Sequence, residues 1–321
     1  MQNFLACRLS FNCVAASNMV LPRNKGSVLR GAFFGALRRD FCLNNTASSC
    51  PTCPAAEMCP VSRLAATVDK ENPRGEEIVR PFALEPIVSD ATQYGQGELF
   101  SFGITLLGKT LTLFPYTVLA IQRMGELGMG NRKLAPGLFS LREVTVSNPL
   151  LSVEKSIFDH ESKLVKVPDV AITHNDVLRY SAALPQDRVR LRLMTPLRLV
   201  MDGKLVHRLT LQALMRRLLR RLTDLHSYFC DEKLELDFHG LLEKAEHVKV
   251  AEDRTYWVDL SSYSRRRQAS TPIGGLVGEI SFAGELQDFL PFLVWGQFTH
   301  AGKDVTKGNG WYEILGVGNR E

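Results

Sequence analysis

Glycine, lysine and threonine residues concentrate near the end of the chain. Ten of the 24 glycines lie in the last fifty residues, so the backbone there needs positive φ angles or close approach to a ligand. Lys303 and Lys307 are interleaved with Gly302, Gly308 and Gly310. The amides of a glycine-rich turn and the ammonium groups of lysines suit an anion such as phosphate. This stretch is therefore the first candidate binding site.

Four of the seven cysteines are clustered, at Cys42, Cys50, Cys53 and Cys59. Two cysteines separated by two residues can hold a metal ion from a tight turn, and two outlying cysteines can complete a tetrahedral thiolate shell. Such a set favours structural zinc, with an iron–sulfur cluster as the second choice. The spacing is not that of a common zinc finger, and unpaired loop cysteines are the alternative. A closed shell would pin the loop rather than bind substrate.

A third group of candidate residues is arginine-rich. Apolar residues recur at helical spacing over residues 211–225, and Arg216, Arg217 and Arg220 lie on the opposite face. Residues 203–223 contain no carboxylate. A solvated basic face and a helix that follows RNA phosphates both remain open. The absence of an acid four residues away within the helix favours the phosphate-binding alternative.

A compact basic loop carries an aromatic residue. Tyr263 is followed by Arg265 and Arg266. A tyrosine ring and arginine planes can stack on unpaired bases, as in single-stranded RNA recognition. An exposed turn without a ligand is the alternative.

In the first half of the chain, the periodic spacing of apolar residues predicts the helices and strands that could position these groups. Their order is strand, helix, strand, strand, helix, strand, which is the ferredoxin-like arrangement also used by RNA-recognition modules. The expected elements are strand 4–11, helix 27–41, strands 82–88 and 98–107, helix 115–127 and strand 141–147.

The second half is compatible with the same arrangement. It combines an alternating strand from residue 188, the arginine-rich helix, strands 255–260 and 277–282, a helix at about 285–295 and a strand at 310–315. Residues 148–186 carry few periodic signals, and we place the domain join there. The expected fold class is α+β, with two tandem ferredoxin-like (βαββαβ) domains: residues 1–165, with the cysteine cluster inserted at 42–59, and residues 186–321, with the glycine-rich loop.

Composition and charge limit the class of protein to which this chain can belong. The chain has 321 residues, 45% of them hydrophobic and 23% charged, which is typical of a globular protein with a sizeable core. Its formal charge of +5 permits a polyanionic partner. The first residues lack the pattern of a signal peptide, and no stretch approaches the ~18 apolar residues of a membrane span. We therefore expect a cytoplasmic protein without a membrane partner.

Several of these motifs together resemble one family. They are Tyr263-Ser-Arg265-Arg266, Gly274-Gly275-Leu-Val-Gly278-Glu279-Ile, Phe289-Leu-Pro291, the pattern from Thr299-His300 through Gly302-Lys303, Thr306 and Gly308 to Gly310, and the early Leu29-Arg30-Gly31-Ala32. This combination resembles the CRISPR-associated endoribonucleases that process precursor CRISPR RNA, members of the repeat-associated mysterious protein superfamily. The resemblance is strong from residue 255 onward and weak from about 60 to 185.

The resemblance implies two ferredoxin-like domains with repeat RNA bound across them. It also implies metal-independent cleavage, in which the 2′-hydroxyl attacks the phosphate and leaves a 2′,3′-cyclic phosphate. His300 is then the candidate base, because it lies within the matched motif and imidazole suits proton transfer near neutral pH. Lys303 is the candidate phosphate contact at the catalytic centre. Arg30 joins the RNA-binding candidates, and other subunits of a CRISPR effector complex are possible partners.

The chain departs from the family pattern at one place. Many members have a catalytic histidine near the start of the first helix, and residues 20–40 contain none. Lys25, Ser27 and Arg30 are the polar candidates there. The alternative function is therefore a non-catalytic guide-RNA-binding subunit of an effector complex. A zinc-stabilised adaptor that binds mainly protein is a third hypothesis.

Overall fold

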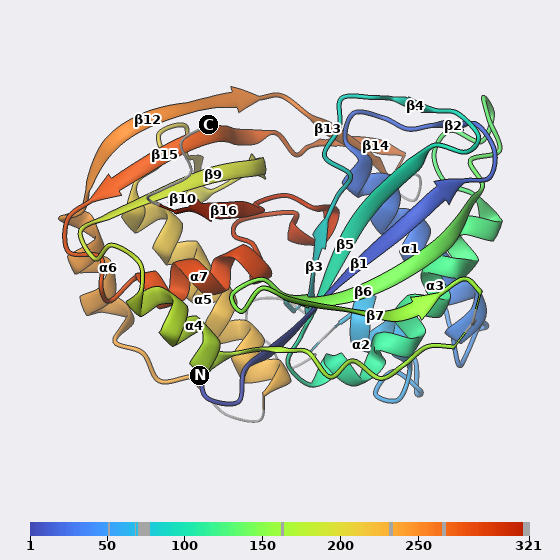
Figure 1. The fold of residues 1–321 in the computed structure, drawn as a ribbon, viewed down its shortest axis with the longest axis horizontal. Coiled ribbons are helices and arrows are strands. Elements are labelled where there is room, and N and C mark those ends of the chain that lie inside the picture. Colours follow the sequence, from blue (N-terminus) through green and yellow to red (C-terminus); the bar gives the residue numbers. More distant parts are fainter. Residues whose placement is uncertain are drawn as a thin grey trace.

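The protein is a mixed α/β structure with two halves that lie side by side (Figure 1). This computed structural model describes residues 1–50, 52–67, 69, 78–161, 164–230, 234–264 and 268–316. Each half contains one large antiparallel sheet with helices packed against it (Figure 1). No helix in the described part of the chain has the length and apolar character needed to cross a bilayer.

The N-terminal sheet has the strand order β3-β5-β1-β6-β7, and β8 pairs with the start of β1. Inward residues such as Leu9 and Phe11 are fully buried and alternate with the partly exposed Arg8 and Ser10, which is why this segment forms a half-buried strand. The strands are β1 (Leu5–Ala15), β3 (Phe82–Glu85), β5 (Leu99–Leu107), β6 (Phe139–Asn148), β7 (Val153–Asp159) and β8 (Ile172–Thr173), with a separate pair of β2 (Met19–Val20) and β4 (Gln93–Tyr94).

Helices of this half bury one apolar stripe each. In α1, Leu29, Phe33 and Leu37 recur at helical spacing and are all buried in the first core. The helices are α1 (Lys25–Phe41), α2 (Pro60–Ala65), the 3₁₀ helix η1 (Gly108–Leu113) and α3 (Phe114–Leu127).

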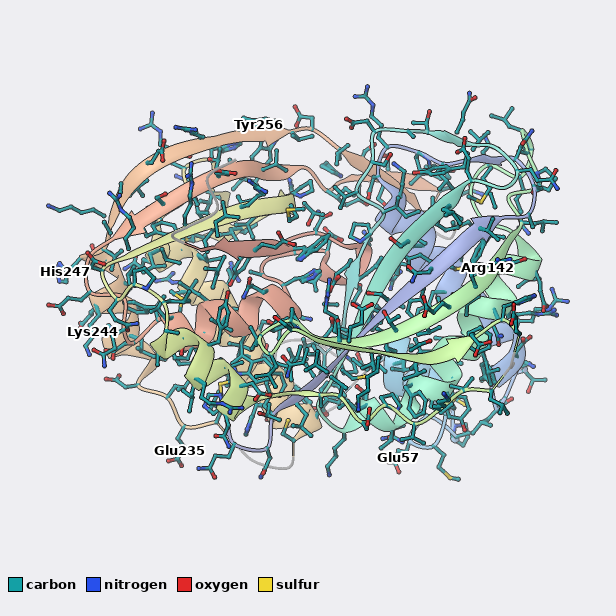
Figure 2. The ribbon with its side chains drawn as sticks, in the orientation of Figure 1. Glu57, Arg142, Glu235, Lys244, His247 and Tyr256 are labelled. Atoms are coloured by element: carbon teal, nitrogen blue, oxygen red, sulfur yellow. The ribbon has the colours of Figure 1, made fainter. Side chains whose placement is uncertain are left out.

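The C-terminal sheet has the strand order β12-β15-β9-β16. Its strands are β9 (Arg188–Leu197), β12 (Lys249–Val258), β15 (Gly275–Ala283) and β16 (Tyr312–Leu315), and two hairpins add β10 (Val200–Met201) with β11 (Lys204–Leu205) and β13 (Ser261–Ser264) with β14 (Ala269–Pro272). The helices are α4 (His174–Ala182), α5 (Leu211–Phe229), α6 (Phe238–Glu246), α7 (Leu290–Thr299) and the 3₁₀ helix η2 (Val305–Lys307). Figure 2 shows Tyr256 of β12 at the outer edge of this sheet.

Both halves arrange their strands in the same order. If β1, β3, β5 and β6 are numbered 1 to 4 along the chain, their order across the sheet is 2-3-1-4, and β9, β12, β15 and β16 have the same order. All these neighbours are antiparallel. The order of elements expected from sequence is therefore present in each half.

Two expectations differ from the structure. The last long helix begins at Leu290 rather than near 285, because Pro291 occupies the first turn, where its missing amide costs nothing. The expected featureless segment 148–186 contains α4, which begins with a capping box between Thr173 and Asp176. The proposed domain limits stay predictions. Phe4, just before β1, and Ala6 of β1 belong to the second core cluster, so the start of the chain also packs with the C-terminal half.

The two halves approach each other closely at Gly26. A β-carbon on this residue would collide with the carbonyl oxygen of Lys307. Nearby, the half-buried Arg221 of α5 donates from Nε to the Thr299 carbonyl at 2.6 Å and from Nη2 to the Phe82 carbonyl at 3.4 Å. Burial lowers the pKa of Arg221 to about 10, so it remains charged at neutral pH. The Gly26 approach sets the start of α1 against the C-terminal half, and Arg221 joins that half to β3.

We predict that Gly26→Ala lowers the free energy of unfolding by about 1–3 kcal/mol, because the added methyl overpacks the contact with Lys307. Chemical denaturation measures the change. The matched control is Gly31→Ala in the same helix, where an added β-carbon meets no atom within 4 Å. The control should gain up to about 1 kcal/mol from helix propensity. Equal effects of the two substitutions would contradict the close approach.

Candidate functional site

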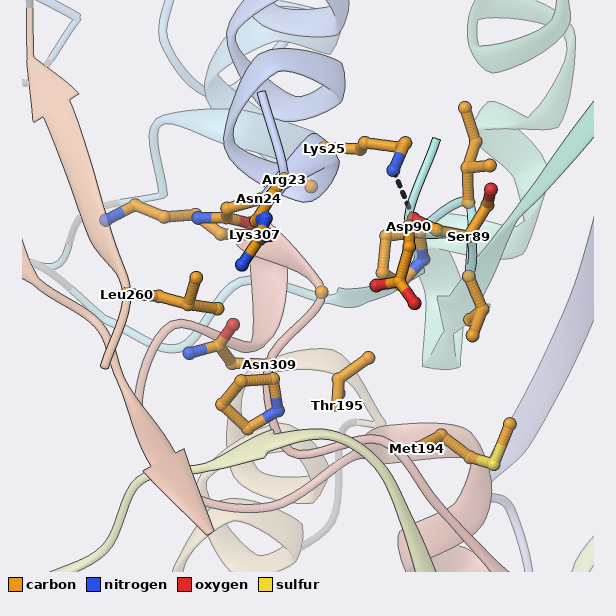
Figure 3. A pocket seen from close by; sticks show the side chains of 16 residues that line it. Arg23, Asn24, Lys25, Ser89, Asp90, Met194, Thr195, Leu260, Lys307 and Asn309 are labelled. Carbon is orange, nitrogen blue, oxygen red and sulfur yellow. Dashed lines mark hydrogen bonds between the residues drawn. The ribbon is translucent and has the colours of Figure 1, made fainter. Parts of the chain in front are cut away.

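A cavity of about 310 Å³ lies at the junction of the two halves (Figure 3). Its walls come from the start of α1, the loop after β3, the end of β9, Leu260 between β12 and β13, and the glycine-rich turn around η2. The lining residues are Arg23, Asn24, Lys25, Gly26, Pro86, Ile87, Val88, Ser89, Asp90, Met194, Thr195, Pro196, Leu260, Lys307, Gly308 and Asn309. Three cationic side chains thus face one acidic side chain, which suits an anionic ligand.

The start of α1 adds positive potential to this cavity. Its N-cap residue, Asn24, donates from Nδ2 to Ser27 Oγ at 2.9 Å and accepts no hydrogen bond from the first turn. The first turn contains no acidic residue. Because the first amides of a helix lack internal partners, the helix dipole places partial positive charge there.

Lys25 is the most unusual residue of the cavity wall. It is only 2% exposed, and its ammonium donates to the carbonyl of Ser89. Figure 3 shows this side chain directed at Ser89 and Asp90. Burial lowers the pKa of Lys25 below its usual value, and the charge of Asp90 opposes the shift.

The glycine-rich turn supplies the opposite wall. Asp304 adopts the left-handed conformation with φ 61° before η2, and its carboxylate lies 2.7 Å from Lys307 Nζ. The buried Asn309 donates from Nδ2 to the Ile273 carbonyl at 2.7 Å, which ties the turn to the link between β14 and β15. Gly308 has a φ of 86°, and a β-carbon there would lie 2.8 Å from Pro86. The turn is therefore held rigidly against the N-terminal half.

Glycines outside the cavity support the same turn. Gly310 has a φ of 72°, and a β-carbon on it would collide with the carbonyl of Ala301. Gly302 has a φ of 83°, and a β-carbon on it would lie 2.6 Å from the Arg198 carbonyl. Lys303 is exposed, and its backbone amide donates a hydrogen bond to the Arg198 carbonyl. It does not line the cavity. Among the predicted residues, Lys307 and Gly308 line the cavity directly, whereas Gly302 and Gly310 shape the backbone.

His300 is not positioned as the sequence suggested. The residue is completely buried, with a φ of 57°, and its ring stacks on Trp311 at 6.2 Å between centroids. Burial, followed by the positive charge of Arg221, lowers the pKa of His300 to about 3, and the nearby Asn309 backbone opposes the shift. Neither ring nitrogen makes a well-formed side-chain hydrogen bond. A ring without exposed surface cannot reach an RNA hydroxyl in this conformation, so His300 is better described as structural.

The arginine face of α5 is partly neutralised. Arg216 lies 3.4 Å from Asp202, and Arg220 lies 3.8 Å from Asp224 on the next turn of the helix. Arg217 donates to the Val200 carbonyl. The expectation that α5 lacks an acid at the fourth following position is wrong, because the helix continues through Asp224. None of these arginines lines the cavity.

The remaining RNA-binding candidates are dispersed. Tyr263 is 65% exposed on β13, and Arg30 is half-buried on α1. Arg265 and Arg266 lie outside the described residues. None of the described candidates in this group lines the cavity.

Sequence reasoning missed a cation–aromatic cluster beside the glycine-rich turn. The guanidinium of Arg198 lies 6.0 Å from the ring centroid of Trp257, and His207 lies 4.4 Å from the same ring. The backbone carbonyl of Arg198 also accepts a hydrogen bond from the Lys303 amide. These residues come from three separate segments, so no local pattern could have joined them.

The four clustered cysteines lie around the loop between α1 and α2. Cys42 directly follows α1, Cys59 directly precedes α2, and the Cys53 amide donates to the Cys50 carbonyl at 3.2 Å. Burial, followed by Cys42 and Cys59, raises the pKa of the Cys50 thiol. The described residues do not gather three or more ligand side chains into a metal-binding arrangement. The geometry therefore does not supply a preformed shell, and the zinc site stays a prediction.

Known proteins can now be compared with this chain. Residues 4–170 match a family model named AF_1859_N, described as an N-terminal domain, and residues 191–312 match the model of the CRISPR-associated endoribonuclease Cas6. No curated protein sequence matched the chain.

Solved structures show the same fold. The product complex of a Thermus thermophilus Cas6 is 14% identical, covers 97% of this chain and 99% of its own, and has a TM-score of 0.59. A partial Cas6-RT-Cas1–Cas2 complex is 14% identical and covers 99% of this chain and 47% of its own, with a TM-score of 0.58. A second Cas6 product complex is 17% identical, covers 96% and 99%, and has a TM-score of 0.51. Residues 191–312 therefore resemble the Cas6 family of CRISPR-associated endoribonucleases by sequence, and the whole chain has a fold similar to that of solved Cas6 structures.

Proposed function

We propose that this protein binds precursor CRISPR RNA repeats and cleaves them at the cavity between its halves, without a catalytic metal. The observation that carries the proposal is the charge of that cavity. Arg23, Lys25 and Lys307 and the start of α1 surround it, against the single carboxylate of Asp90. An RNA backbone is the polyanion that a Cas6-family protein would place in such a site.

The cleavage we propose needs no group beyond RNA and protein. The 2′-oxygen beside the scissile bond attacks phosphorus, the bond to the 5′-oxygen breaks, and a 2′,3′-cyclic phosphate remains. The attacking and leaving oxygens must be in line, so the protein's main task is to hold the backbone. Lys307, fixed by Asp304, and the first amides of α1 would stabilise the charge that develops on phosphorus.

We also propose that each half is a ferredoxin-like unit. The support is the strand order, in which the second, third, first and fourth strands lie in sequence across both sheets. In this arrangement the first helix of one unit and the last turn of the other unit meet at the cavity. RNA bound there would contact both units.

Partners beyond RNA are proposed by analogy with neighbours. The Thermus thermophilus Cas6 forms a product complex, and another neighbour is a Cas6-RT-Cas1–Cas2 complex. We propose repeat RNA as the ligand of this chain, and other CRISPR subunits as its protein partners.

A non-catalytic guide-RNA-binding subunit is the second candidate function. One observation favours it: none of the described residues that line the cavity is a histidine. Under this alternative the cavity holds RNA but supplies no proton acceptor. The two functions differ in whether product forms.

The test of the proposed function is incubation of the protein with its repeat RNA in excess chelator. We expect a single cut, with a cyclic phosphate on the 5′ fragment and a 5′-hydroxyl on the other, because the 2′-oxygen is the nucleophile. A 2′-deoxy substitution at the cut site is the matched control and should abolish cleavage. Tight binding of the all-ribose RNA without product would favour the non-catalytic subunit.

We predict that the salt dependence of RNA binding reports which surface holds phosphates. Replacing Arg23 and Lys307 together with Gln should flatten the slope of log K against log salt by about 1.4, because each phosphate contact on a single strand contributes ~0.7. The control replaces Arg216 and Arg220 with Gln, which removes the same charge. Because these two arginines lie outside the cavity, we expect a loss below about 0.5. The reverse ranking would assign RNA to the α5 face.

Structural zinc at Cys42, Cys50, Cys53 and Cys59 is proposed from the chemistry of four thiolates. Metal analysis of purified protein should find about one zinc per chain, and Cys50→Ser with Cys53→Ser should remove it. Cys7→Ser, which changes a buried cysteine outside the cluster, is the control. If the purified protein contains no metal and the double substitution leaves its stability unchanged, the four cysteines are free thiols.

A further inference from the structure

The cation–aromatic cluster of Arg198, His207 and Trp257 lies outside the cavity, and the proposed cleavage gives it no role. The rings of His207 and Trp257 are 4.4 Å apart between centroids, with 42° between their planes. The guanidinium of Arg198 lies 6.0 Å from the indole centroid. His207 is exposed, whereas Trp257 and Arg198 are half-buried. The cluster therefore offers solvent an imidazole ring that is backed by an indole.

Hydrogen bonds hold the two inner members of the cluster in place. Trp257 Nε1 donates to Asp259 Oδ1 at 2.9 Å, which orients the indole. Arg198 Nη1 donates to the Gly274 carbonyl at 2.9 Å, which holds the guanidinium beside the ring. A platform that is ordered before binding loses little conformational freedom when a ligand arrives. The cluster is thus suited to bind a flat ligand without rearrangement.

The cluster adjoins the glycine-rich turn. The Arg198 carbonyl accepts a hydrogen bond from the Lys303 amide at 3.0 Å, and Gly302 packs against the same carbonyl. Pro196, which lines the cavity, precedes Arg198 by two residues, or about 7 Å along an extended chain. The Pro196 carbonyl accepts from the Gly310 amide at 3.0 Å. An RNA strand that leaves the cavity along this turn would meet the cluster next.

Positive side chains flank the cluster. Arg208 follows His207 directly, Lys204 lies on β11 just before it, and Lys303 is bonded through its amide to Arg198. Arg208, Lys204 and Lys303 are exposed, and none of them forms an ion pair with another described residue. A nucleotide matches both features, because its base can stack on a ring while its phosphate meets the cations.

We propose that the cation–aromatic cluster is a second RNA subsite, in which an unpaired nucleobase stacks on the exposed face of His207. This inference rests on the proposed binding of repeat RNA and adds a contact outside the cavity. Every base has a π-face, so the subsite accepts bases with little regard to their identity. A base inside a duplex is already stacked on its neighbours, so the subsite selects RNA that is single-stranded on one side of the cut.

The test measures the affinity of the protein for repeat RNA with a 2′-deoxy cut site, in which nucleotides are made abasic one at a time. We expect one position, or two adjacent positions, where loss of the base weakens wild-type binding by about 5- to 150-fold. His207→Ala should weaken binding of the intact RNA by a similar factor. In this variant, removal of the same base should cost less than about twofold, because the two changes remove one contact. His207→Tyr keeps a ring and should keep the sensitivity to that base.

The matched control is Tyr256→Ala. Tyr256 neighbours Trp257 on β12 and is 63% exposed, but successive side chains of a strand point to opposite faces of the sheet (Figure 2). Its removal should leave the sensitivity to the abasic position unchanged. If that sensitivity is lost in Tyr256→Ala and kept in His207→Ala, the base stacks on the other face and the proposal is wrong. Melting temperatures check that the variants fold, and the wild-type scan does not depend on them.

Cleavage of all-ribose RNA is measured separately, so that the two proposals can fail independently. If wild type does not cleave but one base still depends on His207, the proposed cleavage is wrong and the subsite stands. If wild type cleaves but no base depends on His207, the subsite is wrong and the function stands. If wild type does not bind repeat RNA, both are wrong.

Discussion

The arrangement depends on one close approach between backbones, that of Gly26 to the carbonyl of Lys307. No side chain larger than hydrogen fits there, so the first turn of α1 lies directly against the glycine-rich turn. This contact places Lys25 on one wall of the cavity and Lys307 on another. Gly308 continues the approach against Pro86. Two segments about 280 residues apart in sequence therefore share one site.

Distribution of charge explains why this site is the best place for a polyanion. The strand β9 and the helix α5 carry more arginines than the cavity wall does, but several of these arginines form ion pairs with acids. Arg190 and Arg192 both contact Glu279, and Arg220 contacts Asp224. Exposed pairs of this kind contribute little to stability, but they reduce the net field that RNA would encounter. Among the described residues, Arg23, Lys25 and Lys307 line the cavity against Asp90, and Asp304 pairs with Lys307, which leaves one positive charge in excess.

Sequence patterns predicted the elements better than the site. The periodicity of strands such as β1 and helices such as α3 was sufficient, since each buries one face. The glycine-rich turn was also predicted, because positive φ leaves a compositional signal. The burial of His300 was not predicted, because it is set by packing against Trp311 and other distant residues. Lys25 was named among the polar residues at the start of the first helix, but its burial was not predicted, because the distant Ser89 accepts its hydrogen bond.

The central claim is that RNA occupies the cavity between the halves. Its most direct test is amine labelling of the native protein, read residue by residue by mass spectrometry, with and without repeat RNA carrying a 2′-deoxy cut site. The account predicts that RNA protects Lys307 and leaves Lys244, outside the cavity, unchanged. Unchanged labelling of Lys307 at saturating RNA would contradict it.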